Sequence, residues 1–226
     1  MDVRGKRIIV TGGFGALGRC VSHALGSAGA TLGLLDHAAA PAALEGAAWH
    51  LGGVDLSEPA TARAAIDKFA ADLGGLDGLV NIAGGFRWET LAAGRVETWD
   101  LLYRMNVRTT VCASRAALAH LDGGGAIVNV AAGAALRAAA GMGPYAAAKA
   151  GVMRLTEALA EEHKAKIRVN AILPSIIDTP ANRRDMPDAD FATWVQPEEL
   201  ATVIQFLLSD AAKGVSGALI SVPGRV

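Results

Sequence analysis

The stretch IIVTGGFGALG, residues 8–18, decides the fold of this 226-residue chain. Its first residues are hydrophobic or β-branched and predict a buried strand, and its glycines then allow the backbone to turn tightly. From Ala16 onward, apolar residues recur with the spacing of a helix. A strand that leads through a glycine-rich turn into a helix presents free backbone N–H groups where a phosphate can bind. An ordinary tight turn is the alternative, but the position after the first strand favours a nucleotide phosphate.

The rest of the chain repeats this alternation of strand and helix. Expected strands are 6–11, 31–36, 49–55, 78–81, 126–131, 167–172 and 218–222, and expected helices are 16–29, 58–73, 96–121, 145–163 and 197–208. This pattern predicts a single doubly wound, Rossmann-type α/β domain over residues 1–226, with a seven-stranded parallel sheet and helices on both faces. The long loops 84–95 and 174–196 follow strands, so we expect them to form a substrate pocket and its lid.

Composition excludes several classes of function. Lys and Arg number 21 against 22 Asp and Glu, and no basic run is present, so nucleic acid is not an expected partner. No run of about 18 apolar residues predicts a membrane span. The first strand follows Met1 too closely for a signal peptide, which predicts a cytoplasmic protein. Neither the cysteines nor the histidines have a metal-binding spacing, so no metal is expected.

Two aspartates end strands beside the glycine turn. The carboxylate of Asp36 is placed to accept hydrogen bonds from the adenosine ribose and to repel a 2′-phosphate, which predicts NAD(H) rather than NADP(H). A solvated aspartate at a strand end is the alternative. Asp55 either caps the following turn or binds the adenine amino group, and the sequence leaves both interpretations open.

Tyr145 and Lys149 are four residues apart, hence on one face of an expected helix. An ammonium beside a phenol favours the phenolate, so we expect Lys149 to lower the pKa of Tyr145. A tyrosine tuned in this way can exchange protons near neutral pH. The spacing alone is common, and it becomes informative because the helix follows a strand that would end near the nicotinamide.

These features together resemble the short-chain dehydrogenase/reductase family. The matching positions are Thr11-Gly12 to Gly18, Asp55, Asn81-Ile82-Ala83-Gly84, Asn106, Tyr145-x-x-x-Lys149 and Arg168-Val169-Asn170-Ala171-Ile172. The resemblance implies that Tyr145, Lys149 and Asn106 are catalytic, with Asn106 supporting a water in a proton relay. It also implies a homodimer or homotetramer formed through 96–121 and 145–163.

The glycine turn, the strand ends and the resemblance together define an expected cofactor site. Its residues are Gly12, Gly13, Phe14, Gly15, Ala16, Leu17, Gly18, Asp36, Asp55, Leu56, Asn81, Ala83, Gly84, Tyr145, Lys149, Pro174, Ile177 and Thr179. The resemblance places Thr179 against the nicotinamide carboxamide. Ala16 replaces a glycine that is usual in the family, and Gly15 beside it preserves the flexibility of the turn.

One departure bears on the substrate, because Ala132 stands where the family usually has a serine. The dihydropteridine reductase branch tolerates this change, and the chain resembles that branch. It shares the alanine, Asn-Ile-Ala-Gly-Gly at 81–85, and a run from Asp178 to Trp194 with Met, Phe and Trp. The expected substrate residues are Phe86, Trp88, Ala132, Arg137, Met186, Phe191 and Trp194. Packing of the lid against the core explains Met186, Phe191 and Trp194 equally well, and an ordinary surface loop explains Phe86 and Trp88 equally well. For Arg137 a structural role is favoured over substrate contact.

Three functions follow from this pattern. The first is NAD(H)-dependent hydride transfer to a small molecule such as a quinonoid dihydropteridine or a similar conjugated acceptor. The second is a general carbonyl or 3-oxoacyl reductase or alcohol dehydrogenase of the same family. The third is a regulatory protein that binds NADH without catalysis, against which the retention of both Tyr145 and Lys149 argues.

Overall fold

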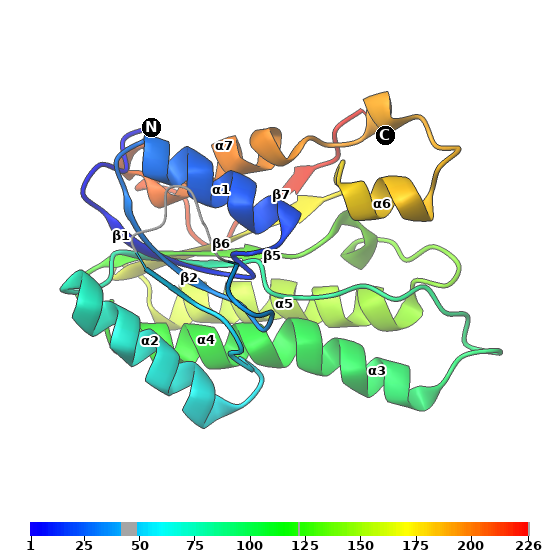
Figure 1. The fold of residues 1–226 in the computed structure, drawn as a ribbon, viewed down its shortest axis with the longest axis horizontal. Helices are drawn as coiled ribbons and strands as arrows, with labels where there is room; N and C mark the ends of the chain where they lie inside the picture. Colours follow the sequence, from blue (N-terminus) through cyan, green and yellow to red (C-terminus); the bar gives the residue numbers. More distant parts are fainter. Residues whose placement is uncertain (42–48, 122, 226) are drawn as a thin grey trace.

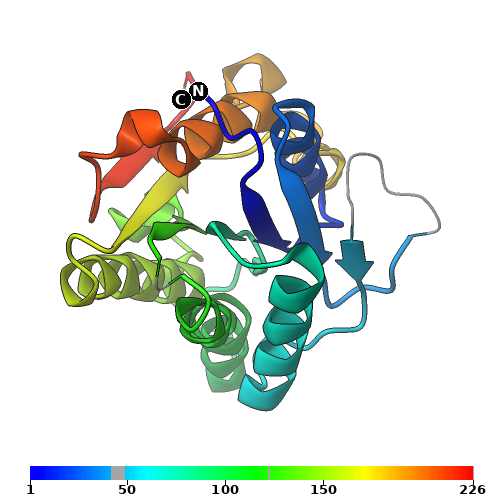
Figure 2. The ribbon, with the colours of Figure 1, turned by 90° about the vertical axis from the view of Figure 1, so that its left-hand side faces the viewer.

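A computed structural model describes residues 1–41, 49–121 and 123–225 of the chain. Its centre is a parallel sheet of seven strands in the order β3-β2-β1-β4-β5-β6-β7 (Figures 1 and 2). The strands are β1 (Arg7–Thr11), β2 (Thr31–Leu35), β3 (Trp49–Leu51), β4 (Gly78–Asn81), β5 (Gly125–Val130), β6 (Ile167–Pro174) and β7 (Leu219–Val222). The expected Rossmann-type fold with seven parallel strands is confirmed.

Helices cover both faces of the sheet (Figure 1). The larger ones are α1 (Ala16–Ser27), α2 (Pro59–Leu73), α3 (Val96–Leu102), α4 (Thr109–Leu118), α5 (Gly143–Glu162) and α7 (Pro197–Leu208). Helices α1 and α7 lie against one face, and α2, α4 and α5 lie against the other. Because strands covered on both sides have no solvated face, their residues are apolar without alternation. Ile8, Ile9 and Val10 are all fully buried, with Ile9 in one core cluster and the other two in its counterpart.

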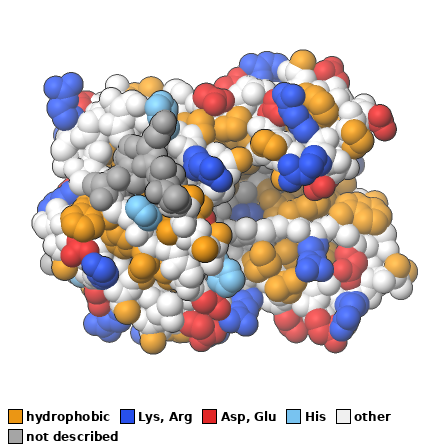
Figure 3. Space-filling model, in the orientation of Figure 1, with side chains coloured by type: hydrophobic (Ala, Val, Ile, Leu, Met, Phe, Trp, Pro, Cys, Tyr) orange, Lys and Arg blue, Asp and Glu red, His pale blue; other side chains and the backbone are white. Residues whose placement is uncertain are grey.

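The strand order reverses at β1, which pairs with β2 on one side and β4 on the other. The connections from these strands leave in opposite directions, so a crevice opens beyond their carboxyl ends. The glycine turn after β1 lies at this crevice. Figure 3 shows the corresponding side of the molecule hollowed between the segment that includes α6 (Pro180–Asp185) and the helices α3 and α5 below it.

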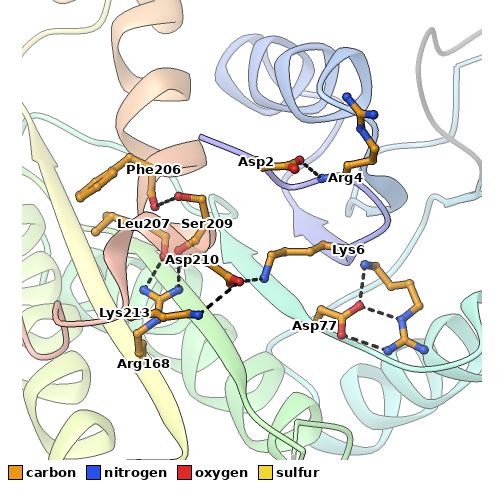
Figure 4. Close-up of polar contacts among 11 residues, drawn as sticks. Asp2, Arg4, Lys6, Asp77, Arg168, Phe206, Leu207, Ser209, Asp210 and Lys213 are labelled. Carbon is orange, nitrogen blue, oxygen red and sulfur yellow. Dashed lines mark hydrogen bonds and ion pairs between the residues drawn. The ribbon is translucent and has the colours of Figure 1, made fainter.

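Polar contacts fasten the opposite end of the sheet, at the amino ends of the strands (Figure 4). Arg7 on β1 pairs with Asp77 just before β4, with 2.7 Å from Nε to Oδ2. The guanidinium of Arg168 on β6 donates to the backbone oxygens of Leu207 and Ser209 at the end of α7. The RVNAI motif therefore contributes to stability through Arg168, far from the crevice.

The third strand is shorter than its sequence indicates. A strand over 49–55 is expected, but β3 ends at Leu51. Gly53 adopts φ +73°, outside the range of a strand, and its N–H donates to the carbonyl of Ala38. A side chain at Gly52 would collide with the backbone around Ala39. The two glycines turn the chain early, so the expectation of a strand to Asp55 is wrong.

The expected helix 96–121 is not uniform either. It runs as α3, a π-helical segment η1 (Tyr103–Arg108), and α4. Within η1 the side-chain amide of Asn106 donates to the carbonyl of Leu102 at 3.0 Å, and thereby competes with the backbone for that acceptor.

The lid region 174–196 also differs from an irregular loop, because it contains α6 and a short turn of helix, η3 (Phe191–Thr193).

None of the helices in the described part of the chain has the length and apolar character needed to cross a membrane.

Burial in the sheet predicts the cost of removing core side chains. Leu79 on β4 is 0% exposed and Leu91 is 82% exposed. We expect Leu79→Ala to lower the free energy of unfolding by about 2–5 kcal/mol, because it leaves a cavity. Leu91→Ala should change it by no more than about 0.5 kcal/mol. Urea denaturation of both variants tests this, and equal effects would contradict the placement of β4 at the centre of the core.

Candidate active site

The glycine turn after β1 is shaped for close approach of the backbone. Gly12 has φ +68°, and a Cβ there would lie 2.8 Å from the backbone nitrogen of Ala83. A Cβ at Gly18 would collide with the carbonyl oxygen of Gly12. Gly12 is therefore required by the close approach of the backbone that follows β4. Gly18 is required by the close approach of α1 to the turn.

The start of α1 fits a phosphate. Its N-cap is Gly15, which has no side chain to satisfy the first backbone N–H groups, and the first turn of the helix carries no acidic residue. The unsatisfied N–H groups and the positive end of the helix dipole favour an anion. Gly15 and Ala16 are both exposed, so a dinucleotide pyrophosphate can reach them.

Asp36 lies beside this turn, one residue after β2. Its Oδ2 accepts a hydrogen bond from the backbone N–H of Phe14 and its Oδ1 accepts one from Ala38, both at 2.9 Å. The carboxylate thus orders the glycine turn from the outside. Each oxygen has a second acceptor position, so the same group can also accept hydrogen bonds from ribose hydroxyls.

Asp55 caps a turn, which supports the first of its two interpretations. Its Oδ1 accepts hydrogen bonds from the N–H and hydroxyl of Ser57, and its Oδ2 pairs with Arg104 at 2.9 Å. The hydrogen bond from Ser57 is the main reason that the pKa of Asp55 lies below its ordinary value. Leu56 between them is buried in the core, and its expected contact with the cofactor stays a prediction. Adenine binding by Asp55 stays a prediction.

Asn81 points into the sheet. Its side-chain amide donates to the hydroxyl of Ser114 at 3.0 Å and to Asn129 Oδ1 at 2.9 Å, and Asn129 in turn donates to Thr156. This buried chain of hydrogen bonds ties β4 and β5 to helices α4 and α5. Asn81 therefore positions the strand that leads to Ala83 and Gly84. Sequence patterns do not reveal this chain of hydrogen bonds, because its four side chains come from β4, α4, β5 and α5.

The structure brings together the three residues expected to be catalytic. Lys149 is 5% exposed, and its Nζ donates to the carbonyl of Val130 at 2.8 Å and lies 5.9 Å from the ring centre of Tyr145. A Cβ at Gly84 would lie 3.4 Å from Lys149 Nζ and would press against Asn106 Oδ1. The absence of a side chain at Gly84 thus allows the backbone to pass between Asn106 and Lys149.

Asn106 holds the loop that follows β4. Its Oδ1 accepts from the N–H of Gly85 at 3.2 Å, and its Nδ2 donates to the Gly85 carbonyl at 3.0 Å. The same amide also donates to the carbonyl of Leu102 within its own helix, so one side chain joins the π-helical turn to this loop. Turns of this kind inside helices are frequent at functional sites.

Burial, and not the neighbouring ammonium, dominates the ionisation of Tyr145. Loss of hydration raises the pKa of Tyr145 to about 12 and lowers the pKa of Lys149 to about 8. The expectation that Lys149 lowers the pKa of Tyr145 is therefore wrong for this structure. The phenol is protonated at neutral pH, which suits a proton donor.

The expected substrate residues divide into two groups. Ala132 is buried at the end of β5, and Phe86 packs edge-on against Tyr145, with ring centres 5.0 Å apart and planes at 88°. Arg137 is exposed, and the indole N–H of Trp88 donates to the carbonyl of Ala140. Phe86 therefore lies directly beside Tyr145, whereas Trp88 is held by the loop that precedes α5.

The lid is held by an internal network. Arg183 forms a bidentate pair with Asp178 and lies over the ring of Phe191, which packs against Trp194. Trp194 is 2% exposed and so belongs to the core side of the lid. The structure thus favours packing over substrate contact for Trp194, while Met186 is exposed.

The end of β6 leads directly into the lid. Pro174 is the last residue of that strand, and Ile177 accepts a hydrogen bond from Asn182 through its carbonyl. Thr179 caps α6 by accepting from the N–H of Asn182 at 3.2 Å. The Thr179 hydroxyl still has a proton to donate, as its expected contact with a carboxamide requires.

Comparisons with known proteins agree with this geometry. A family profile described as short chain dehydrogenase matches residues 6–190. The chain belongs to the short-chain dehydrogenase/reductase family. Among curated relatives, 4-formylbenzenesulfonate dehydrogenase of Comamonas testosteroni is 31% identical, over 99% of this chain and 98% of the relative. D-threitol dehydrogenase of Mycolicibacterium smegmatis is 32% identical, over 97% of this chain and 92% of the relative.

Solved structures of the family match this chain over almost its whole length. A short-chain type dehydrogenase/reductase from Mycobacterium ulcerans superposes with a TM-score of 0.91 at 26% identity, over 100% of this chain and 90% of the other. A family member from Brucella melitensis gives 0.90 at 28% identity, over 99% and 98%. The protein is therefore an oxidoreductase of a family that acts on small molecules with a nicotinamide cofactor.

The buried amine of Lys149 predicts a pH-dependent stability. Below about pH 8 the folded and unfolded chains both hold the proton, so burial of the charge destabilises the fold by a constant amount. Between about pH 8 and 10.5 only the unfolded chain keeps it, so stability rises with pH, by at most about 1.4 kcal/mol per unit. In urea denaturation we therefore compare the free energies of unfolding of the unaltered protein and of Lys149→Met. The value for the unaltered protein minus the value for the variant should rise with pH over this range.

The control for this measurement is Lys164→Met, because the side chain of Lys164 is 76% exposed. Its stability relative to the unaltered protein should vary little with pH from 7 to 10. Measurements stay below pH 10 because the raised pKa of Tyr145 acts in the opposite direction above that value. A Lys149→Met difference as flat as that of the control would contradict the depressed pKa.

Proposed function

We propose that this enzyme is an NAD(H)-dependent reductase whose acceptor is a planar conjugated ring of the quinonoid dihydropteridine type. The observation that carries the proposal is the meeting of Tyr145, Lys149 and Asn106 around the backbone of Gly84, at the crevice that the glycine turn also borders. A phenol, an amine and an amide in one partly dry site suit hydride transfer that is coupled to proton transfer.

A reduced nicotinamide supplies the hydride when it is bound. Tyr145 supplies the proton, since its raised pKa keeps the phenol protonated before the reaction. Lys149, whose pKa is lowered to about 8, is still mostly charged at pH 7 and stabilises the phenolate that remains. Its position beside Gly84 also suits hydrogen bonding to the nicotinamide ribose.

The preference for a conjugated acceptor rests on Ala132 and Phe86. Reduction of a ketone concentrates negative charge on one oxygen, and a second hydrogen-bond donor beside Tyr145 would stabilise it. Ala132 has no such donor. A quinonoid pterin spreads the charge over a nitrogen-containing ring, so Tyr145 alone can supply the proton. The exposed face of Phe86 next to Tyr145 offers a surface on which a flat ring can stack.

The preference for NAD(H) over NADP(H) rests on Asp36. Its carboxylate is fixed by Phe14 and Ala38 at the place where an adenosine ribose would lie. A 2′-phosphate there would meet a like charge. The fixed carboxylate therefore selects against the phosphate and for the two free hydroxyls.

Substitution of Asp36 tests the cofactor preference. We expect kcat/KM to be at least about tenfold higher with NADH than with NADPH, since a like-charge contact costs more than about 1.4 kcal/mol. Asp36→Ala should reduce this ratio, mainly through a lower KM for NADPH, while His37→Ala serves as the neighbouring control. A ratio that Asp36→Ala leaves unchanged would show that another group selects the cofactor.

A second function, oxidation of an alcohol or reduction of a simple carbonyl, is favoured by the relatives. Their names include dehydrogenases of 4-formylbenzenesulfonate, D-threitol and 2-(S)-hydroxypropyl-CoM.

The third alternative, a protein that binds NADH without catalysis, has no need of a proton donor such as Tyr145. Association of two or four copies through 96–121 and 145–163 stays a prediction.

A substrate panel with two variants separates these functions. NADH oxidation is measured with freshly generated quinonoid dihydropterin, ketones and 3-oxoacyl thioesters, and the reverse reaction with alcohols and NAD. Tyr145→Phe should lower kcat by about 10²–10⁴-fold on any true substrate. Ala132→Ser should raise turnover of ketones by about tenfold or more and leave the dihydropterin rate unchanged, because only the ketone needs the added donor.

Each alternative has its own outcome. A large gain on quinonoid dihydropterin from Ala132→Ser would contradict the role given to Ala132. Turnover of ketones or alcohols without pterin activity would establish the second function. NADH binding without turnover of any compound would establish the third.

A further inference from the structure

Two loops at the mouth of the crevice are joined to each other. We define the β4 loop as residues 82–95 and the β5 loop as residues 131–142, each named for the strand that it follows. The indole N–H of Trp88 donates to the carbonyl of Ala140 at 3.0 Å, and the backbone N–H of Glu89 donates to the carbonyl of Gly141 at 2.9 Å. These hydrogen bonds cross-link two connections that the sequence separates by about 50 residues.

Gly141 makes this cross-link possible. It has φ +74°, a conformation that side chains rarely adopt, and a Cβ there would collide with the indole ring of Trp88. The ring therefore lies directly against the glycine backbone. Trp88 is nevertheless 62% exposed, so most of the residue stays open to solvent.

The cross-link lies two residues from the aromatic contact with Tyr145. The ring of Phe86 meets the ring of Tyr145 edge-on, with ring centres 5.0 Å apart, and Phe86 is 52% exposed to solvent. On one side of Phe86, the backbone of Gly85 is held by both polar atoms of Asn106. On the other side, Trp88 is held by the β5 loop. Phe86 is thus fixed between two anchors, with one open face.

Glu89 fixes the far side of the same loop. Its carboxylate accepts hydrogen bonds from the hydroxyl of Thr98, at 2.7 Å, and from the backbone N–H of Arg95 at the start of α3. The hydrogen bond from Thr98 is the main reason that the pKa of Glu89 lies below its ordinary value. The β4 loop is therefore attached to η1, the β5 loop and α3, although it contains no regular secondary structure.

We propose that Trp88 is a positioning residue: its cross-link to Ala140 and Gly141 holds Phe86 against Tyr145, so that Phe86 forms an aromatic wall that favours planar unsaturated substrates over saturated ones. The proposal rests on the function given above in one respect, namely that Tyr145 is the proton donor. It assigns Trp88 a role different from direct substrate contact, because its polar edge is already used by the β5 loop.

The physical basis of this role is preorganisation. A free loop would lose conformational entropy each time that it closed on a substrate, and a loop that is already fixed does not. Stacking on an aromatic ring adds attraction that a saturated substrate does not gain, worth a factor of about two to ten in affinity. Without the cross-link, Phe86 would have to be ordered by the substrate itself.

The kinetic test is a double-mutant cycle on Trp88 and Phe86. It uses one planar and one saturated compound from the panel that the enzyme turns over. Trp88→Ala should raise KM for the planar compound about two- to tenfold, leave KM for the nicotinamide cofactor unchanged and reduce the preference for planar over saturated. When Phe86→Ala is already present, Trp88→Ala should add no further change. Leu91→Ala, in the same loop, should match the unaltered enzyme.

Additive effects of Trp88→Ala and Phe86→Ala would overturn the proposal, because they would mean that Trp88 acts independently of Phe86. An unchanged KM in Trp88→Ala would do the same. Trp88→Phe removes the N–H donor but keeps an aromatic ring, and it serves if the alanine variant does not fold. It should give a smaller change in the same direction.

Hydrogen exchange tests the cross-link without any substrate. The amide of Glu89, which donates to Gly141, should exchange faster in Trp88→Ala than in the unaltered protein, while Leu91→Ala should leave it protected. Equal exchange in all three proteins would overturn the proposal. This measurement decides on the cross-link even if no compound in the panel is turned over, an outcome that would count against the proposed function instead.

Discussion

The carboxamide of Asn106 is the interaction on which the rest of the site depends. It is fully buried, and its two polar atoms make hydrogen bonds to Leu102 in its own helix and to both the N–H and the carbonyl of Gly85. One side chain thereby opens the helix, positions the β4 loop and leaves only enough room for a glycine at position 84 beside Lys149. Because a buried amide without partners is costly, loss of these contacts would destabilise the site.

The parts of the structure that the sequence predicts are those with strong local patterns. Apolar strands covered on both faces, and glycines at a turn before a helix, have direct physical causes, so the sheet and the glycine turn before α1 could be found without coordinates. Tyr145 and Lys149 could also be placed on one helix face from their spacing. The central strands and α1 match the expected ranges within one or two residues, including β6, which ends at Pro174 and not at residue 172.

The errors arise where a tertiary contact overrides the local pattern. β3 ends early because Gly52 and Gly53 meet the backbone that follows β2, and the helix after the β4 loop widens because Asn106 takes a backbone acceptor. The sequence predicts a lowered pKa for Tyr145 because a charge lies four residues away, yet burial raises this pKa. Spacing in a sequence gives the neighbours of a group but not its hydration.

The π-helical turn at η1 changes the orientation of Asn106 but leaves the packing of the neighbouring helices as it is. Such a turn contains one residue more than the α-helical turn that would otherwise join α3 to α4, and the helices on either side keep their packed faces. A chain shortened by one residue here could close the turn as regular helix and keep the same core, but it would lose the orientation of Asn106. The length of this segment therefore constrains the orientation of Asn106, and an alignment gap within residues 103–108 would mark a relative in which this side chain is held differently.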